Sequence, residues 1–219
     1  MSMKSISLRA GLVLGLGMTL LPAAGITPLA PAALAQGAPA SAVSAPVQAL
    51  YAALDKVQHA HSSFAERSQI VGAAVDQAYD LDAVLHASIG LRYQSLTPDD
   101  KTKLLAAFRN FTVARYVSSF KPGSDARFTV KPGLENSPVG GNKIVNTYIG
   151  AEDSMPGTPL SYIMHNDASG WKIVDVLLGE SRISQAAAQR SDFSSTLASG
   201  GVSGLITVLD RKVKTFSND

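Results

Sequence analysis

The chain has 219 residues, 46% of them hydrophobic and 16% charged, which is enough apolar material for one ordinary domain with a sizeable core. It contains no Cys, and this excludes disulfides, a thiol nucleophile and CxxC metal or redox sites. The 19 basic and 17 acidic residues nearly balance, so the chain lacks the basic excess that is typical of nucleic-acid binders.

The first 35 residues have the pattern of a cleavable signal peptide. Lys4 and Arg9 precede an apolar run over 11–21, and Ala33-Leu34-Ala35 offers small residues at the two positions that a signal peptidase reads. An uncleaved membrane anchor is the alternative, but the run is shorter than the roughly 18–20 residues of a spanning helix. We therefore expect residues 1–35 to be removed on export. The mature chain then keeps 17 of the 19 basic residues, since Lys4 and Arg9 are lost, and all 17 acidic ones.

The remainder of the chain is simple in organisation. Residues 36–45 are small, uncharged and contain proline, which indicates a flexible leader. We find no internal repeat and no second linker in the sequence, so residues 46–219 are expected to form a single domain.

The first half of this domain has the apolar spacing of helices. The clearest start is Thr97-Pro98-Asp99-Asp100, which combines an N-cap, a proline at the first helical position and two carboxylates at the positive end of the helix dipole. Lys121-Pro122-Gly123 ends that helix. The predicted helices cover 46–61, the stretch from a break near Ser62 to Asp76, 79–89 and 97–120.

Short segments rich in Val, Ile, Thr and Tyr follow, and turn-forming residues separate them. Helices, then consecutive strands, then helices indicate an α+β fold built on a four-stranded antiparallel meander. Ser199-Gly200-Gly201 divides two final helices. The predicted strands cover 127–131, 142–150, 159–166 and 171–178, and the final helices cover 181–198 and 202–216.

The last predicted strand carries apolar residues at both parities, with Ile173 on one and Val174 and Val176 on the other. A sheet of four antiparallel strands normally keeps one face in water and shows clean polar alternation. Helices covering both faces would explain the pattern. A curved sheet whose concave side encloses an apolar cavity under helices would explain it equally well.

Two arginines lie within apolar stripes of predicted helices, Arg115 on the helix from Pro98 and Arg190 on the helix from Ser181. Burying an unpaired guanidinium is costly, so each needs a carboxylate, carbonyl groups or an anionic ligand. Asp175 and Asp80 are the interior-looking acids available to them. Either these residues form structural ion pairs, or the arginines contact a headgroup or phosphate at a pocket mouth.

Several motifs, in this order and spacing, resemble the MlaC family, also called toluene-tolerance or phospholipid-binding proteins. They are Tyr79-Asp80-Leu81, Gly90 with Leu96-Thr97, Phe108 with Tyr116, Gly170-Trp171-Lys172-Ile173-Val174-Asp175-Val176 with Gly179 and Ser181, and Gly204-Leu205-Ile206 with Leu209. The resemblance covers essentially all of 46–219. Arg190-Ser191-Asp192-Phe193, with Phe111-Thr112-Val113-Ala114, is most similar to the hopanoid-associated HpnM branch. Tyr79 departs from the usual Phe, and Arg92-Tyr93 stands where Trp is common; both departures bear on the ligand more than on the fold.

The resemblance implies an NTF2-like curved sheet wrapped by about six helices around an apolar cavity. It implies a periplasmic carrier that shields a phospholipid or hopanoid during transfer between inner and outer membranes. An inner-membrane ABC transporter complex, an outer-membrane lipoprotein and transient membrane contact are the implied partners. Chosen by residue type, the predicted lipid-tail contacts are Phe111, Val145, Tyr148, Tyr162, Met164, Val174 and Val176.

Two other function classes stay open. An NTF2-like enzyme could use Asp175 with Tyr148 or Tyr162 for proton transfer, although the sequence offers no recognisable nucleophile–base pair. A docking adaptor of a membrane transport complex would need no large apolar interior. The sequence has no Gly-rich phosphate loop and no cluster of metal ligands, so we expect no cofactor, nucleotide or metal.

Overall fold

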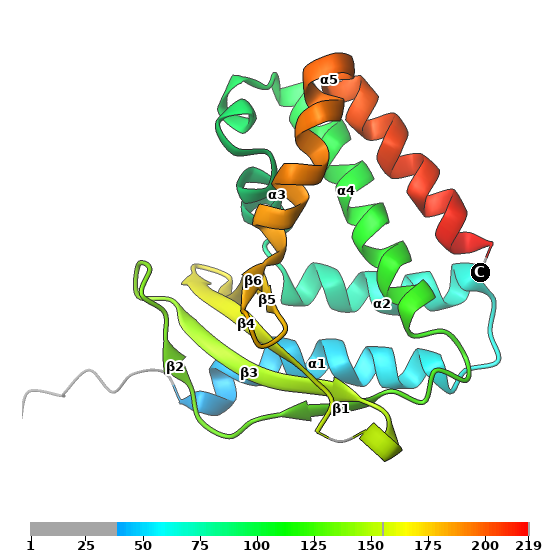
Figure 1. Cartoon of the computed structure of the whole chain (residues 1–219), viewed down its shortest axis with the longest axis vertical. Helices are drawn as coiled ribbons and strands as arrows, with labels where there is room; N and C mark the ends of the chain where they lie inside the picture. The colour runs from blue at the N-terminus through cyan, green and yellow to red at the C-terminus, as the bar shows by residue number, and fades with distance from the viewer. Residues whose placement is uncertain (1–38, 155, 219) are drawn as a thin grey trace, which may run out of the picture. The chain divides into compact units, whose positions relative to one another are not determined.

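The computed structural model of the chain describes residues 39–154 and 156–218, so the predicted signal peptide lies outside the described residues. Figure 1 shows the order of the elements. They are α1 (Ala40–Gln58), α2 (Phe64–Ala78), α3 (Leu81–Ile89), the 3₁₀ turn η1 (Gly90–Ser95), α4 (Pro98–Ser119), β1 (Arg127–Val130), β2 (Glu135–Asn136), β3 (Lys143–Gly150), the 3₁₀ turn η2 (Glu152–Ser154), β4 (Thr158–Asp167), β5 (Gly170–Leu178), β6 (Ile183–Ser184) and α5 (Gln185–Ser217). Within these two ranges, none of the helices combines the length and apolar character needed to cross a membrane.

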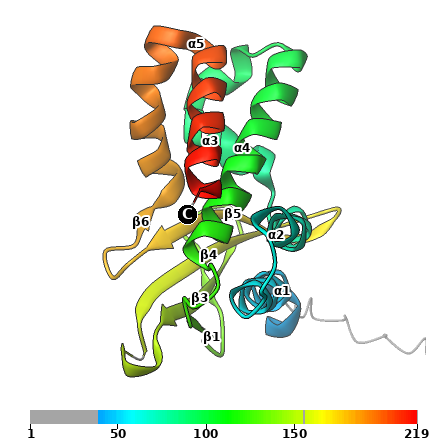
Figure 2. The ribbon, with the colours of Figure 1, turned by 90° about the vertical axis from the view of Figure 1, so that its right-hand side faces the viewer.

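The sheet is antiparallel throughout, in the order β1-β3-β4-β5-β6, and β2 pairs with the first residues of β3. Helices α1 and α2 lie along one face of the sheet, whereas α4 and the two halves of α5 are directed away from it (Figures 1 and 2). The described residues belong to one compact unit. The predicted α+β class with an antiparallel meander is confirmed.

Details of the prediction differ. The sheet has six strands because the short β2 and β6 add to the four expected ones, and the described part of the chain has five α-helices where about six were expected. The two predicted final helices are the halves of α5, which is kinked at Gly201 with φ of 59° and ψ of −157°. Ser184 rather than Ser181 caps α5, since its hydroxyl accepts a hydrogen bond from Ala187 N at 3.0 Å.

The flexible leader predicted over 36–45 is wrong for its second half. Residues from Ala40 onward form the first turns of α1, and Val43 is fully buried there. Pro46 lies inside this helix, where it was expected to begin the helix. A proline there forfeits one main-chain bond, and the packing of Val43 and Val47 against the core offsets this cost.

The helix starts follow local chemistry. Thr97 Oγ1 accepts a hydrogen bond from Asp100 N at 3.1 Å, which confirms the predicted start of α4. Ser63 and Glu66 form a reciprocal capping box at the start of α2, beside the predicted break near Ser62.

A β-bulge explains why β5 carries apolar residues at both parities. The register pairs Tyr162 with Val176 and Met164 with Ile173, which leaves Val174 without a partner position. This extra residue shifts the alternation by one. Ile173 and Val176 therefore face the helices together although they are three residues apart, and both are buried.

The opposite face of the sheet, which we call the outer face, carries a polar network. Ser161 Oγ donates to Asn146 Oδ1 at 2.6 Å, and Asn146 Nδ2 donates to Glu135 Oε1 at 2.8 Å. Arg182 completes the network with two bonds to Glu135, at 2.9 and 3.1 Å. The sheet thus has one core face and one mixed face, on which Ile144 is buried beside the polar network.

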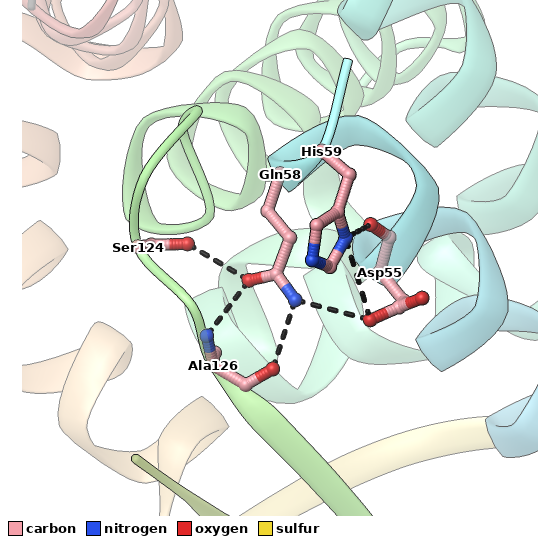
Figure 3. A network of polar contacts seen from close by, with 5 residues as sticks. All are labelled: Asp55, Gln58, His59, Ser124 and Ala126. Atoms are coloured by element: carbon pink, nitrogen blue, oxygen red, sulfur yellow. Dashed lines mark hydrogen bonds and ion pairs between the residues drawn. The ribbon is translucent and has the colours of Figure 1, made fainter. Parts of the chain in front are cut away.

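Gln58 attaches the end of α1 to the start of the sheet. Its side chain is 2% exposed, and its amide pairs with both main-chain groups of Ala126, as a neighbouring strand would. The two distances are 2.8 Å from Nε2 to the carbonyl and 2.9 Å from the main-chain N to Oε1 (Figure 3). Ser124 Oγ donates to Oε1 at 2.9 Å, and Nε2 also donates to Asp55 at 3.1 Å. These bonds fix the chain directly before β1.

Gln58→Leu should lower the free energy of unfolding by about 2 kcal/mol, because the main-chain groups of Ala126 lose their buried partner. Gln48→Leu is the matched control, since Gln48 is exposed on the same helix. Urea denaturation of both variants measures the difference. Equal stability of the two variants would show that the Gln58 bonds do not hold β1.

Candidate functional site

The predicted tail contacts lie mainly in the interior between the sheet and the helices. Four of the seven residues lie on the sheet face toward α1 and α2, and the fifth, Phe111 of α4, packs against Phe216 of α5 with 6.1 Å between the ring centroids; all five belong to one hydrophobic cluster. They are Phe111 (6% exposed), Val145 (0%), Tyr162 (1%), Met164 (0%) and Val176 (3%). Contact with a lipid stays a prediction for all seven residues.

These five side chains fill the interior instead of surrounding an empty space. A cavity wide enough for hydrocarbon would leave accessible area on the side chains that line it, and these have almost none. The expected open apolar cavity is thus closed in this structure. The protein's own side chains occupy the place where a lipid tail was predicted.

The other two predicted residues lie elsewhere. Tyr148 pairs in register with Pro159 and faces the outer side, where Lys131 Nζ lies 5.4 Å from its ring centroid. Tyr148 also lines a small cavity of about 190 Å³ beside Arg182. Val174 is the half-buried bulge residue. The prediction that Tyr148 shares one lining with Tyr162 is wrong, because the two lie on opposite faces of the sheet.

Four tyrosines from four elements meet in the interior, and we call them the tyrosine seam: Tyr51 of α1, Tyr79 at the end of α2, Tyr116 of α4 and Tyr162 of β4. The Tyr79 and Tyr116 hydroxyls share a hydrogen bond of 2.5 Å. The Tyr51 hydroxyl bonds Thr147 Oγ1 at 2.7 Å, and its ring meets Tyr162 edge-on at 5.9 Å. The seam places polar hydroxyls inside an otherwise apolar core.

Burial keeps the seam hydroxyls neutral. It raises the pKa of Tyr51, Tyr79, Tyr116 and Tyr162 above the usual value, because the phenolate would lose its hydration. Proximity of the other hydroxyls raises the pKa of Tyr162 further, and the charge of Arg115 acts in the opposite direction on Tyr79 and Tyr116. The seam is therefore a set of neutral donors and acceptors that satisfy one another.

Each end of the seam reaches a surface cleft. Tyr79 lies in the lining of a cleft of about 570 Å³ between α2, α3, α4 and the β4–β5 turn, which we call the Tyr79 cleft. Tyr51 lines a second cleft, of about 600 Å³, beside β1, which we call the Tyr51 cleft. Sequence reasoning assigned no site role to Tyr51, Tyr79 or Tyr116. Tyr79 and Tyr116 stood out in the sequence only as members of the motifs that resemble the family, and Tyr51 only as a residue of an apolar helical stripe.

Within the described residues, neither of the predicted arginines forms an ion pair. Arg115 is half-buried over the ring of Phe111, 5.7 Å from the centroid, and none of the carboxylates in the described part of the chain lies within ion-pairing distance of it. Arg190 is exposed, and its Nε and Nη2 donate to Ala87 O at 2.9 and 2.5 Å. Contact of Arg115 with a headgroup stays a prediction.

The predicted acids serve the main chain instead. Asp175 accepts hydrogen bonds from Ser184 Oγ at 2.5 Å, from Ala186 N at 3.1 Å and from Val176 N at 2.8 Å, so it ties the start of α5 to β5. Asp80 accepts from Ala83 N at 2.9 Å and caps α3. Asp175 pairs in register with Ile163 on the outer face, away from Tyr162. The proton-transfer pair of Asp175 with Tyr162 is therefore not assembled, and the hydrogen bonds of Asp175 within the described residues go to Val176, Ser184 and Ala186 and not to Tyr148.

Comparisons with known proteins agree with this fold. Residues 45–211 match the model of the family described as MlaC protein. A phospholipid-binding protein from Ralstonia solanacearum, solved in complex with a phospholipid, has a TM-score of 0.66 at 16% sequence identity. The match covers 80% of this chain and 98% of that one, and at this identity it shows the fold. The chain has no match among curated proteins.

The seam predicts a cooperative alkaline transition. Above pH of about 10 the unfolded chain ionises its tyrosines while the folded chain holds the seam protonated, so stability falls as pH rises. Tyrosinate absorbance should rise in one step together with loss of the helical circular dichroism, and Tyr116→Phe should reduce the height of that step. A gradual rise in absorbance with the helices intact would show that the seam is open to water.

Proposed function

The chain belongs to the MlaC family, and on this premise we propose that it binds a phospholipid in the interior between sheet and helices and carries it through water. One observation carries the proposal. The core face of the sheet is apolar, and a seam of neutral hydroxyls crosses it between two surface clefts. The Ralstonia solanacearum protein, which shares the fold, is a phospholipid-binding protein.

Transfer through water requires such a shield because hydrocarbon is costly to expose. Each methylene contributes about 0.8 kcal/mol, so one 16-carbon chain faces roughly 12 kcal/mol and two chains about twice that. A carrier needs an interior that matches the membrane approximately, so that loading and release both stay feasible. An interior of Val, Met and aromatic side chains has this character.

Loading requires the helices to separate from the sheet, since the protein's own side chains fill the interior in this structure. Helix α4 joins the sheet through the short connection of residues 120–126, whereas α5 follows strand β6 directly. Gly123 lies in this connection at φ of 81°, a region that glycine adopts without strain. Small rotations there would move α4 away from Tyr162, while the bonds of Asp175 hold the first turn of α5 in place.

Lipid tails would then replace the contacts that the helices lose. Lipid tails and apolar side chains both keep water away from the core face of the sheet, so opening does not expose that face to water. The hydroxyls of Tyr79 and Tyr116 would exchange their mutual bond for water or for ester oxygens of the lipid.

The setting of this activity follows from the same premise. We place the carrier in the periplasm after removal of residues 1–35, with exchange at an inner-membrane ABC transporter complex and at an outer-membrane lipoprotein. The apolar run over 11–21 and the resemblance to the family support this setting. A hopanoid is the second ligand class for the same interior, since it has a similar apolar character.

Protein purified from the cells that make it should carry lipid. Organic extraction and mass spectrometry should yield about one phospholipid or hopanoid per chain, because the folded protein shields the tails from water. The control is the same protein unfolded, freed of lipid and refolded, which should be empty and should reload from vesicles. An empty native protein that also fails to reload would overturn the carrier.

Tyr116→Phe should loosen the closed form. The Tyr79 hydroxyl then loses its partner in a fully buried position, so the free energy of unfolding of the empty protein should fall by about 1 kcal/mol. Retention of lipid against acceptor vesicles should rise by up to about fivefold, since only the closed form is penalised. Tyr148→Phe on the outer face is the control and should change neither quantity. Weaker lipid retention by Tyr116→Phe would show that the seam does not oppose loading.

A further inference from the structure

The lining of the Tyr79 cleft is charged, whereas the seam behind it is neutral. Its volume of about 570 Å³ lies within the range of roughly 300–1,000 Å³ that is typical of small-ligand sites. Tyr79 itself separates the two regions, because its ring lines the cleft while its hydroxyl bonds Tyr116 in the interior. The charged residues of the lining are Asp76, Asp80, Asp82, Arg109, Asp167 and Lys172.

The two cations of the cleft differ in their partners. Arg109 forms a two-pronged ion pair with Asp76, at 2.6 Å from Nε and 2.7 Å from Nη2. Lys172 Nζ donates to the main-chain carbonyl of Gln77 at 2.6 Å. In the part of the chain that the structure describes, Lys172 has no carboxylate within ion-pairing distance. Lys172 is therefore a positive charge with capacity for an anion.

The three remaining carboxylates accept bonds from neutral donors. Asp80 accepts from a main-chain N–H of α3, Asp82 from the hydroxyl of Tyr93, and Asp167 from the main-chain N–H and hydroxyl of Ser169, both at 2.6 Å. These bonds hold the carboxylates in place without cancelling their charge. The bonds from Ser169 also lower the pKa of Asp167, which favours its ionised form. The cleft thus has four carboxylates, two cations and an excess of negative charge.

We propose that the Tyr79 cleft selects a phospholipid whose headgroup carries a primary ammonium, such as phosphatidylethanolamine. The inference rests on the proposed carrier function and deepens it by naming the headgroup. The phosphate lies toward Lys172 and the ammonium toward Asp80 and Asp82, while the tails pass Tyr79 into the seam. The apolar part of the lining, Leu81 and Leu105, suits the glycerol end of the tails.

The charges of the cleft discriminate among headgroups. A phosphatidylglycerol headgroup brings a phosphate and no cation, so it meets the excess of carboxylates without compensation. A quaternary choline carries a positive charge but no N–H donors, so it cannot bond the oxygens of Asp80 and Asp82. A primary ammonium has both the positive charge and the N–H donors.

Competitive loading tests the inference. Lipid-free protein is incubated with vesicles of equal parts phosphatidylethanolamine and phosphatidylglycerol, re-isolated, and its bound lipids are quantified by mass spectrometry. We expect an enrichment of phosphatidylethanolamine of about fivefold, the effect of one partly screened charge contact. Asp82→Asn should bring the ratio close to that of the vesicles, since it removes the charge but keeps an acceptor for Tyr93. Asp210→Asn, an exposed site on α5 outside the cleft lining, should leave the ratio unchanged.

The outcomes separate the two proposals. Bound lipid in the same ratio as the vesicles, unchanged by Asp82→Asn, would overturn the headgroup inference and leave the carrier intact. Equal loading from vesicles of phosphatidylcholine and phosphatidylethanolamine would overturn the role of the ammonium N–H donors. Failure to load either lipid would overturn the carrier function itself, and the inference with it.

Discussion

The structure depends on keeping one face of the sheet away from water, the face that holds Tyr162 and Val176. Apolar area contributes about 25 cal/mol per Å² when it is removed from water, so this face must always be covered. Helices α1 and α2 cover it, and Tyr116 of α4 lies beside Tyr162. Hydrocarbon is a chemically similar cover. The same face can therefore act as protein core when the protein is empty and as pocket wall when it is loaded, and the balance between the two covers decides which state is populated.

Apolar contact alone would not fix how the helices close on the sheet, because it has no preferred direction. Hydrogen bonds are directional and can fix this arrangement. The seam supplies such bonds between elements that must separate on loading. The bond between Tyr79 and Tyr116 and the bond between Tyr51 and Thr147 each contribute only about 0.5–1.5 kcal/mol net. Such bonds define one closed arrangement and are weak enough to be exchanged for a ligand. This accounts for hydroxyls in a core that could have used Phe.

Local features of the fold were readable from the sequence, and features set by pairing were not. The cap at Thr97, the break in helical geometry at Gly201 and the four longer strands depend on neighbouring residues, and all were predicted. The bulge at Val174 depends on the register with β4, which one strand cannot show. The seam joins residues up to 111 positions apart, and the bonds of Asp175 go to main-chain N–H groups rather than to an arginine. Residue type indicates that a buried polar group needs a partner without saying which one.

The two ends of the seam are not equivalent, and this gives loading a direction. At the Tyr51 end, Asp55 and Ala126 line the cleft and belong to the Gln58 network, which binds α1 to the start of β1 by three hydrogen bonds. At the other end, the Tyr79 cleft is bordered by exposed polar contacts such as the ion pair of Asp76 with Arg109, and exposed pairs contribute little, about 0–1 kcal/mol. Separation costs less where the contacts are weaker. A lipid would thus enter past Tyr79, tails first into the neutral seam, and its charged headgroup would stop among the charges at the mouth, where it loses least hydration.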